Sequence, residues 1–186
     1  PGYKFQNLHF NRRIVDGCVQ CHADRVAQNP ESTHLFQKDP FPELAISCER
    51  CHGPGESHVN AWTVGNGPTG EDPIVNPEKL SGDLRDHVCF QCHLISESRL
   101  LRYGRSDFDF RPGDHITDIW TTFVQGSGID SQSGTRAVSQ VGQMLSSRCH
   151  LESDGHMGCT SCHDPHRTPK PAEKHSFFRS KCLTCH

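Results

Sequence analysis

The sequence predicts a mainly α-helical fold with extensive loops, in which something other than aliphatic side chains fills much of the interior. Only 33 % of the 186 residues are hydrophobic, whereas an ordinary soluble domain has roughly 45 to 50 % with glycine counted. Eleven cysteines and fourteen histidines indicate that a metal, a cofactor or disulfides supply the missing core. Helix-spaced apolar residues and connections rich in proline and glycine complete the pattern.

One pentapeptide, Cys-x-x-Cys-His, occurs five times, and we name the copies motif 1 to motif 5 in chain order. The intervals between them are irregular, so a chemical site is repeated and not a solenoid unit. The cysteines are Cys18, Cys21, Cys48, Cys51, Cys89, Cys92, Cys159, Cys162, Cys182 and Cys185, and the histidines are His22, His52, His93, His163 and His186.

This spacing is the attachment signature of c-type haem. The two thiols bond covalently to neighbouring edges of the porphyrin, and the adjoining histidine becomes the proximal ligand of the iron. Zinc cages and disulfide frameworks also use paired cysteines, but neither explains a histidine after every second cysteine. We therefore predict five covalently bound c-type haems. Because haem is attached outside the cytoplasm, we expect an exported protein, periplasmic or extracellular.

Nine histidines remain as candidates for the distal side of the irons. Imidazole is the expected sixth ligand at most sites, because only Met144 and Met157 could supply a thioether. From their context we choose His34, His58 and His166. Since three residues span about 10 Å, His166 follows His163 too closely to reach the same iron and is expected to bind a neighbouring one. The further candidates are His9, His87, His115, His150, His156 and His175, and at least four of the nine are spare.

Taken in chain order, residues 1–93 and 159–186 are the two haem-bearing segments of a single domain, 1–186. Within the first, residues 66–83 are rich in proline and glycine and predict a surface loop. The second is a tight two-haem unit with a basic loop at residues 166–175. The chain stops on the last residue of motif 5, so we expect the native protein to continue past it.

Residues 94–158 form a haem-free insert for which we predict mainly helical structure. In residues 135–150, Val138, Val141 and Leu145 share one face at helical spacing, with Gly134 just before the helix. In residues 114–124, Ile116, Ile119, Trp120 and Phe123 also fit helical spacing, although the threonine, valine and isoleucine content favours a strand. We predict a helix there too.

Cys149 is the one cysteine outside the motifs. It lies in Ser-Ser-Arg-Cys-His, residues 146–150, which matches the attachment motif except that serine replaces the first cysteine. A sixth haem held by a single thioether to Cys149, with His150 as ligand, is one interpretation. A buried structural thiol or an intermolecular link is the other, and it is the one we adopt.

The five motifs, together with CERCHGPGESH (residues 48–58), GCTSCHDPH (158–166) and the terminal CLTCH, resemble the multihaem cytochrome c superfamily. The similarity is to the tetrahaem cytochrome of ammonia oxidisers and its hydroxylamine oxidoreductase relatives. It implies a mostly helical, loop-rich fold wrapped around haems that form the core in parallel and perpendicular pairs, with electron transfer as the shared function. Catalytic relatives have a lysine in one motif or a tyrosine linked to the porphyrin, whereas all five motifs here keep histidine.

We therefore predict an electron carrier and not an enzyme, with mostly bis-histidine haems and redox proteins, including other cytochromes, as partners. Two alternatives stay open. One is a subunit of an extracellular cytochrome filament or other complex, and the other is an oxidoreductase with one open haem acting on a small nitrogen or sulfur species. The net charge of −3 and the lack of a Lys/Arg block argue against nucleic acid. No apolar run reaches the roughly 18 residues of a membrane span.

Overall fold

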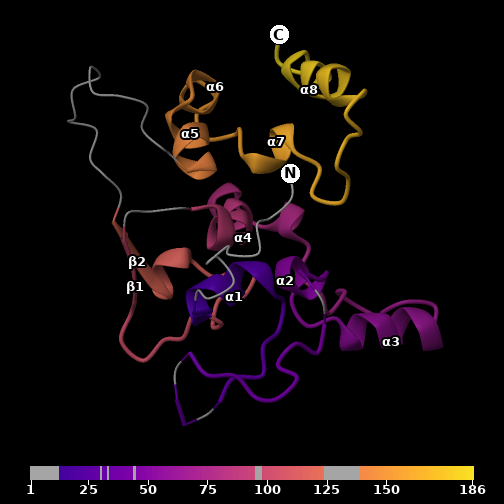
Figure 1. The fold of residues 1–186 in the computed structure, drawn as a ribbon. Helices are drawn as coiled ribbons and strands as arrows, with labels where there is room; N and C mark the ends of the chain where they lie inside the picture. The colour runs from indigo at the N-terminus through magenta and orange to yellow at the C-terminus, as the bar shows by residue number, and fades with distance from the viewer. Residues whose placement is uncertain (1–12, 30, 33, 44, 95–97, 124–138) are drawn as a thin grey trace.

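The computed structural model describes residues 13–29, 31–32, 34–43, 45–94, 98–123 and 139–186. It is mostly helical with much loop and one small sheet, as predicted (Figure 1). In chain order the elements are α1 (Asp16–His22), α2 (Glu49–His52), α3 (Glu56–Val64), η2 (Pro77–Lys79), α4 (Gly82–His93), β1 (Ser98–Leu101), η3 (Ile116–Asp118), β2 (Trp120–Phe123), α5 (Gln140–Ser146), α6 (Arg148–Leu151), α7 (Cys159–Cys162) and α8 (Lys174–Cys182).

Helix α4 is the centre of the molecule. It contacts α1, η2, η3, α5 and α7, and in Figure 1 it lies between the lower elements and the α5 to α8 group above them. Its buried Phe90 joins a hydrophobic cluster with Phe110, Ile116, Ile119, Trp120 and Val141. That cluster is where the haem-free insert packs against the helix that carries motif 3.

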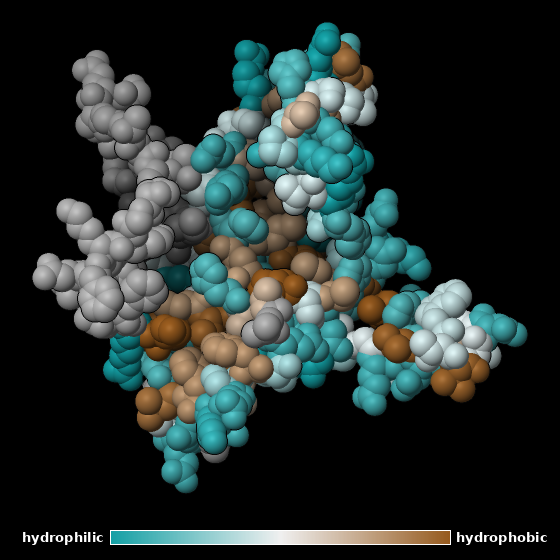
Figure 2. Space-filling model, turned by 45° about the vertical axis from the view of Figure 1, so that its right-hand side comes forward, coloured by the Kyte–Doolittle hydropathy of each residue, from teal (hydrophilic) through white to brown (hydrophobic). Residues whose placement is uncertain are grey.

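The side-chain core is small. Nine hydrophobic residues are buried in the described part of the chain, whereas fifteen large hydrophobic side chains there are exposed. Figure 2 shows apolar surface lying open across the middle of the molecule and on the arm formed by α3. On that arm Val59, Trp62 and Val64 are 52, 56 and 88 % exposed. Exposed apolar surface on this scale is unfavourable in water. In the described part of the chain, the side chains therefore leave much apolar surface uncovered around a small core.

The helix predicted over residues 114–124 is wrong. The segment makes one 3₁₀ turn, η3, and then strand β2, which pairs antiparallel with β1 so that Ser98 lies opposite Phe123 and Leu101 opposite Trp120. Threonine and aromatic residues suit the pleated surface of a strand, and β1 supplies a pairing partner that the local pattern cannot reveal. Ile116, Ile119 and Trp120 are all buried, which explains why apolar residues recur at helix-like spacing. Ile116 lies in η3, however, Ile119 follows it, and Trp120 begins β2.

The helix predicted over residues 135–150 is confirmed where the segment is described, as α5 and then α6 with a break at Ser147, whereas residues 135–138 lie outside the described residues. Helix α5 begins after Ser139, whose side chain accepts a hydrogen bond from the Gly142 amide at 2.9 Å, and buries Val141. It ends at Ser147, where ψ of 144° breaks the helix before α6. Gly134 and Val138 lie outside the described residues. In its described residues, 94, 98–123 and 139–158, the insert has two strands, the 3₁₀ turn η3 and two short helices. The mainly helical structure expected for 94–158 as a whole stays a prediction.

The predicted surface loop at residues 66–83 is confirmed apart from the single turn η2 and the first residues of α4. None of the helices in the described ranges is long and apolar enough to cross a bilayer.

Candidate functional site

Each motif lies on a helical turn, which explains why its three chemical groups face the same way. Motif 1 is in α1, motif 2 in α2, motif 3 ends α4, motif 4 is in α7, and motif 5 starts at the last residue of α8. In motifs 2, 4 and 5 the histidine amide donates to the carbonyl of the first cysteine at 2.9, 3.0 and 3.1 Å. Residues i, i+3 and i+4 of a helix share a face, so two thiols and one imidazole project together.

His52 of motif 2 is held by the loop that follows α3. Its Nδ1 lies 2.8 Å from the carbonyl oxygen of Val75, and the Val75 amide donates to the His52 carbonyl at 3.0 Å. A ring nitrogen next to a carbonyl must be the protonated one, so the lone pair of Nε2 is free to bind a metal. His52 is half-buried, whereas the other four motif histidines are exposed.

Motif 1 and motif 3 meet through a buried polar cluster. The residue before the second cysteine is glutamine in both motifs, and Gln20 and Gln91 are each only 1 % exposed. The Gln20 amide donates to the Gln91 carbonyl at 3.1 Å. Arg99 donates to that same carbonyl at 3.0 Å and to Oε1 of Gln20 at 2.9 Å, and its guanidinium stacks 3.8 Å above the Trp120 ring. We name Gln20, Gln91 and Arg99 the glutamine junction.

The two cysteines of motif 3 on α4 each lie close to a cysteine of another motif. Cys21 of motif 1 pairs with Cys92 of motif 3. A hydrogen bond from the Cys92 thiol lowers the pKa of Cys21 to about 6, and the same bond raises the pKa of Cys92. Likewise Cys89 of motif 3 pairs with Cys159 of motif 4, and their hydrogen bond lowers the pKa of Cys89 and raises that of Cys159. In space, therefore, motif 3 stands between motif 1 and motif 4.

Motif 4 is also fastened to α4 by a carboxylate. Asp86, 7 % exposed, accepts a hydrogen bond from the Cys159 amide at 3.0 Å and so caps α7. Gly158 makes this approach possible, since a Cβ there would lie 2.5 and 2.6 Å from the two carboxylate oxygens. Its φ of −131° suits any residue, so the close contact and not the backbone conformation explains the glycine.

His58 has the most complete surroundings among the candidate distal ligands. It lies in the first turn of α3, and its Nδ1 is 2.7 Å from Oδ1 of Asp72. The other carboxylate oxygen of Asp72 accepts a hydrogen bond from the Trp62 indole at 3.2 Å. The bond from His58 is the largest cause that lowers the pKa of Asp72. As in His52, the occupied Nδ1 leaves Nε2 free.

His166 lies beside motif 2 and not beside its own motif 4. Its ring centre is 5.9 Å from that of His52, and the two planes differ by 11°. The two rings are stacked, so His166 approaches a motif other than its own in space. Its role as a ligand there stays a prediction.

His34 and His87 differ from His58 in how Nδ1 is used. The Asp16 amide approaches Nδ1 of His34 at 3.2 Å, and the Ile116 amide approaches Nδ1 of His87 at 3.4 Å. Next to an N–H donor, Nδ1 acts as the acceptor, so Nε2 carries the proton. Burial is the largest cause that lowers the pKa of His87. In these conformations neither ring presents a free Nε2.

The remaining candidate distal ligands are His150, His115, His156, His175 and His9. Nδ1 of His150 lies 2.7 Å from the Met157 carbonyl, so this ring also leaves Nε2 free. The ring centre of His115 is 5.5 Å from that of His87. His156 and His175 are exposed, and His9 lies outside the described residues. Cys149 is exposed, so the expectation of a buried thiol there is wrong, and none of the eleven cysteines forms a disulfide within the chain.

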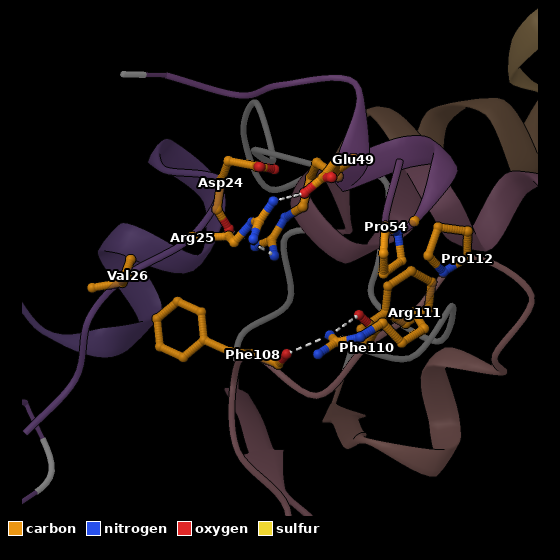
Figure 3. A pocket seen from close by; sticks show the side chains of 11 residues that line it. Asp24, Arg25, Val26, Glu49, Pro54, Phe108, Phe110, Arg111 and Pro112 are labelled. Atoms are coloured by element: carbon orange, nitrogen blue, oxygen red, sulfur yellow. Dashed lines mark hydrogen bonds and ion pairs between the residues drawn. The ribbon is translucent and has the colours of Figure 1, made fainter. Parts of the chain in front are cut away.

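A cavity of about 330 Å³ opens beside motif 2, between the chain after α1 and residues 108–112 (Figure 3). Arg25 pairs there with Glu49, and Arg111 donates to the carbonyls of Phe108 and Phe110 at 2.7 and 2.8 Å. Guanidinium groups beside phenyl rings suit a flat group that carries carboxylates.

The donor chemistry of these sites fits c-type haem. Each motif places its thiols and imidazole at helical positions that share a face, Nδ1 is fixed by a hydrogen bond in His52 and His58, and large apolar side chains are exposed in the described part of the chain. In the described part of the chain, no three His, Cys, Asp or Glu side chains converge on a site for a bare metal ion.

Sequence reasoning did not single out Asp72, Asp86 or the glutamine junction. Most of their contacts join residues far apart in the sequence, from 14 residues for Asp72 and His58 to 79 for Arg99 and Gln20. The one local signal was the glutamine shared by motifs 1 and 3, at a position that the attachment motif leaves free.

Residues 4–53 match the family described as "Cytochrome c554 and c-prime". The matched stretch contains motif 1 and motif 2, and it supports the resemblance to multihaem cytochromes c over those residues. The family implies c-type haem and haem-based electron transfer. Searches of curated proteins and of solved structures found no significant match.

Proposed function

We propose that this protein transfers electrons through five c-type haems, one at each motif. The observation that carries the proposal is the shared geometry of the motifs, in which two thiols and an imidazole project from one helical turn five times. When bound, each haem iron supplies a one-electron redox centre whose potential the surrounding protein tunes.

The chain's own residues hold and orient these groups. The cysteines of each motif provide two thioether anchors, and the motif histidine provides the proximal imidazole. We assign His166 to the distal side of the motif 2 iron because of its 5.9 Å approach to His52. His58 and His34 are the next distal candidates. Of these two, the free Nε2 of His58 favours it in the present conformation, whereas His34 needs its ring to turn.

The order of the attachment sites in space differs from their order in sequence. The paired thiols of motifs 1 and 3, and of motifs 3 and 4, support an arrangement in which motif 3 on α4 is the central site. The glutamine junction and Asp86 hold its two neighbours in place. Electron carriers of this kind exchange electrons with other redox proteins, and we propose such partners and an exported location, since c-type haem is attached outside the cytoplasm.

The test is the number of covalent haems. We expect a pyridine haemochrome assay on purified protein to give five haems per chain, and four after Cys48→Ala combined with Cys51→Ala. The control Cys149→Ala leaves the number at five. Protein without the absorption bands of covalently bound haem would refute the proposal, and a count of six that falls to five in Cys149→Ala would assign a haem to that thiol.

A further inference from the structure

We propose that Asp72 is a positioning residue that fixes the ring of His58 for binding to haem iron and lowers the reduction potential of that haem. The inference rests on the proposed function, because it concerns a ligand of a haem iron. No catalytic role is attributed to Asp72, which acts only through His58.

The contact itself has the geometry of an orienting hydrogen bond. Oδ1 of Asp72 lies 2.7 Å from Nδ1 of His58, and the two side chains are only 29 and 33 % exposed. A carboxylate accepts but cannot donate, so Nδ1 must carry the proton, and in the neutral ring Nε2 then carries the lone pair. A carboxylate bonded in this way raises the basicity of an imidazole that ligates a metal.

Asp72 is itself held in place. Its second oxygen accepts the indole N–H of Trp62 at 3.2 Å, one helical turn after His58 on α3. The loop between Trp62 and Asp72 packs on the indole ring at Gly67, where a Cβ would lie 3.1 to 3.4 Å from three ring atoms. The φ of +101° at Gly67 also favours glycine there. The carboxylate therefore has one position relative to the helix.

The same loop also orients the proximal candidate of motif 2. Three residues after Asp72, the carbonyl of Val75 fixes Nδ1 of His52 at 2.8 Å. One short segment, residues 72–75, thus sets the tautomer of two imidazoles, His52 through a neutral carbonyl and His58 through a charged carboxylate. The charged partner makes His58 the more basic ring, and a more basic ligand favours ferric over ferrous iron.

The test compares haem-loaded variants by potentiometric titration, low-temperature electron paramagnetic resonance and haem-to-protein ratio. Asp72→Asn keeps the shape and an acceptor oxygen but removes the charge, whereas Asp72→Ala removes both. Glu71→Gln is the matched control, since it removes a charge from the adjacent exposed position. Trp62→Phe leaves the bond to His58 and removes only the second partner of Asp72.

We expect Asp72→Asn to raise the reduction potential of one haem by about 59 mV, which is a tenfold change in the one-electron equilibrium. Tenfold is the lower end of the loss in metal affinity or activity that follows removal of a hydrogen-bond partner of a ligating residue. Asp72→Ala is expected to shift it at least as far and to change the resonance of one low-spin site. The haem count, the other four potentials and Glu71→Gln stay as in the wild type, whereas Trp62→Phe, which removes the bond that holds Asp72, shifts the same potential by less than Asp72→Ala does.

Several outcomes overturn the inference while five haems remain bound, and so leave the proposed function intact. These are unchanged potentials in both Asp72 variants, an equal shift in Glu71→Gln, or six-coordinate haems throughout in His58→Ala. If Asp72→Ala loses haem, the isosteric Asp72→Asn decides the matter. Wild-type protein without covalent haem refutes the proposed function instead.

Discussion

Replacing Gly158 with alanine tests how motif 4 is fastened to α4. The new Cβ would lie 2.5 and 2.6 Å from the Asp86 oxygens, well inside van der Waals contact, so the carboxylate must move. Moving it breaks the 3.0 Å bond to the Cys159 amide, a loss of about 1.5 to 3 kcal/mol for a charged acceptor. Overpacking adds about 1 to 3 kcal/mol. We expect the free energy of unfolding to fall by about 3 kcal/mol or more.

For a chain of this size, about 3 kcal/mol corresponds to a Tm lowered by roughly 6 to 12 °C. The assay is thermal unfolding of the haem-loaded protein, followed by far-ultraviolet circular dichroism. Gly70→Ala is the control, because no atom lies within 4 Å of a Cβ there. In an Asp86→Ala background, Gly158→Ala should cost little more, since both changes remove the same contact. A Tm equal to that of Gly70→Ala, or an undiminished loss in the Asp86→Ala background, would refute the reasoning.

Three further predictions follow from other contacts. Arg99→Met removes two hydrogen bonds and the stacking of the guanidinium on Trp120. It is expected to reduce the free energy of unfolding by about 2 to 4 kcal/mol. Denaturant titration measures this, and the control Arg105→Met, at an exposed position, should leave the free energy of unfolding unchanged. Ser139→Ala removes the cap of α5 and should lower the Tm by roughly 2 to 4 °C, from about 1 kcal/mol; an unchanged Tm contradicts the cap. His166→Ala should leave one coordination position open, so that the reduced protein binds carbon monoxide more than the wild type does, and equal binding contradicts its assignment to motif 2.

The motif turns and the small core could be predicted because both are local or compositional properties. Five copies of one pentapeptide fix which residues share a face, and an apolar share of 33 % leaves too little material for an ordinary interior. The expectation that His166 serves a motif other than its own also follows from chain reach alone. In the structure its ring centre lies 5.9 Å from that of His52.

Other features depend on partners that a local pattern does not contain. Residues 120–123 form a strand because Ser98–Leu101 lies alongside them, whereas helical spacing alone gave the wrong element. Likewise Asp72 looked like one polar residue of a surface loop. Its role becomes visible only when the loop folds back over α3 and places its carboxylate beside His58.

The glutamine junction constrains how the finished molecule is made. In the folded chain, Gln20 and Gln91 are sealed against each other, and Cys21 and Cys92 beside them are only partly exposed, which restricts the access of an attachment enzyme to both thiols. Under the proposed function, we expect the cofactors to be joined to motifs 1 and 3 while the polypeptide is still open, with α1 closing on α4 afterwards. Biosynthesis is then ordered, with covalent loading of each segment coming before tertiary assembly.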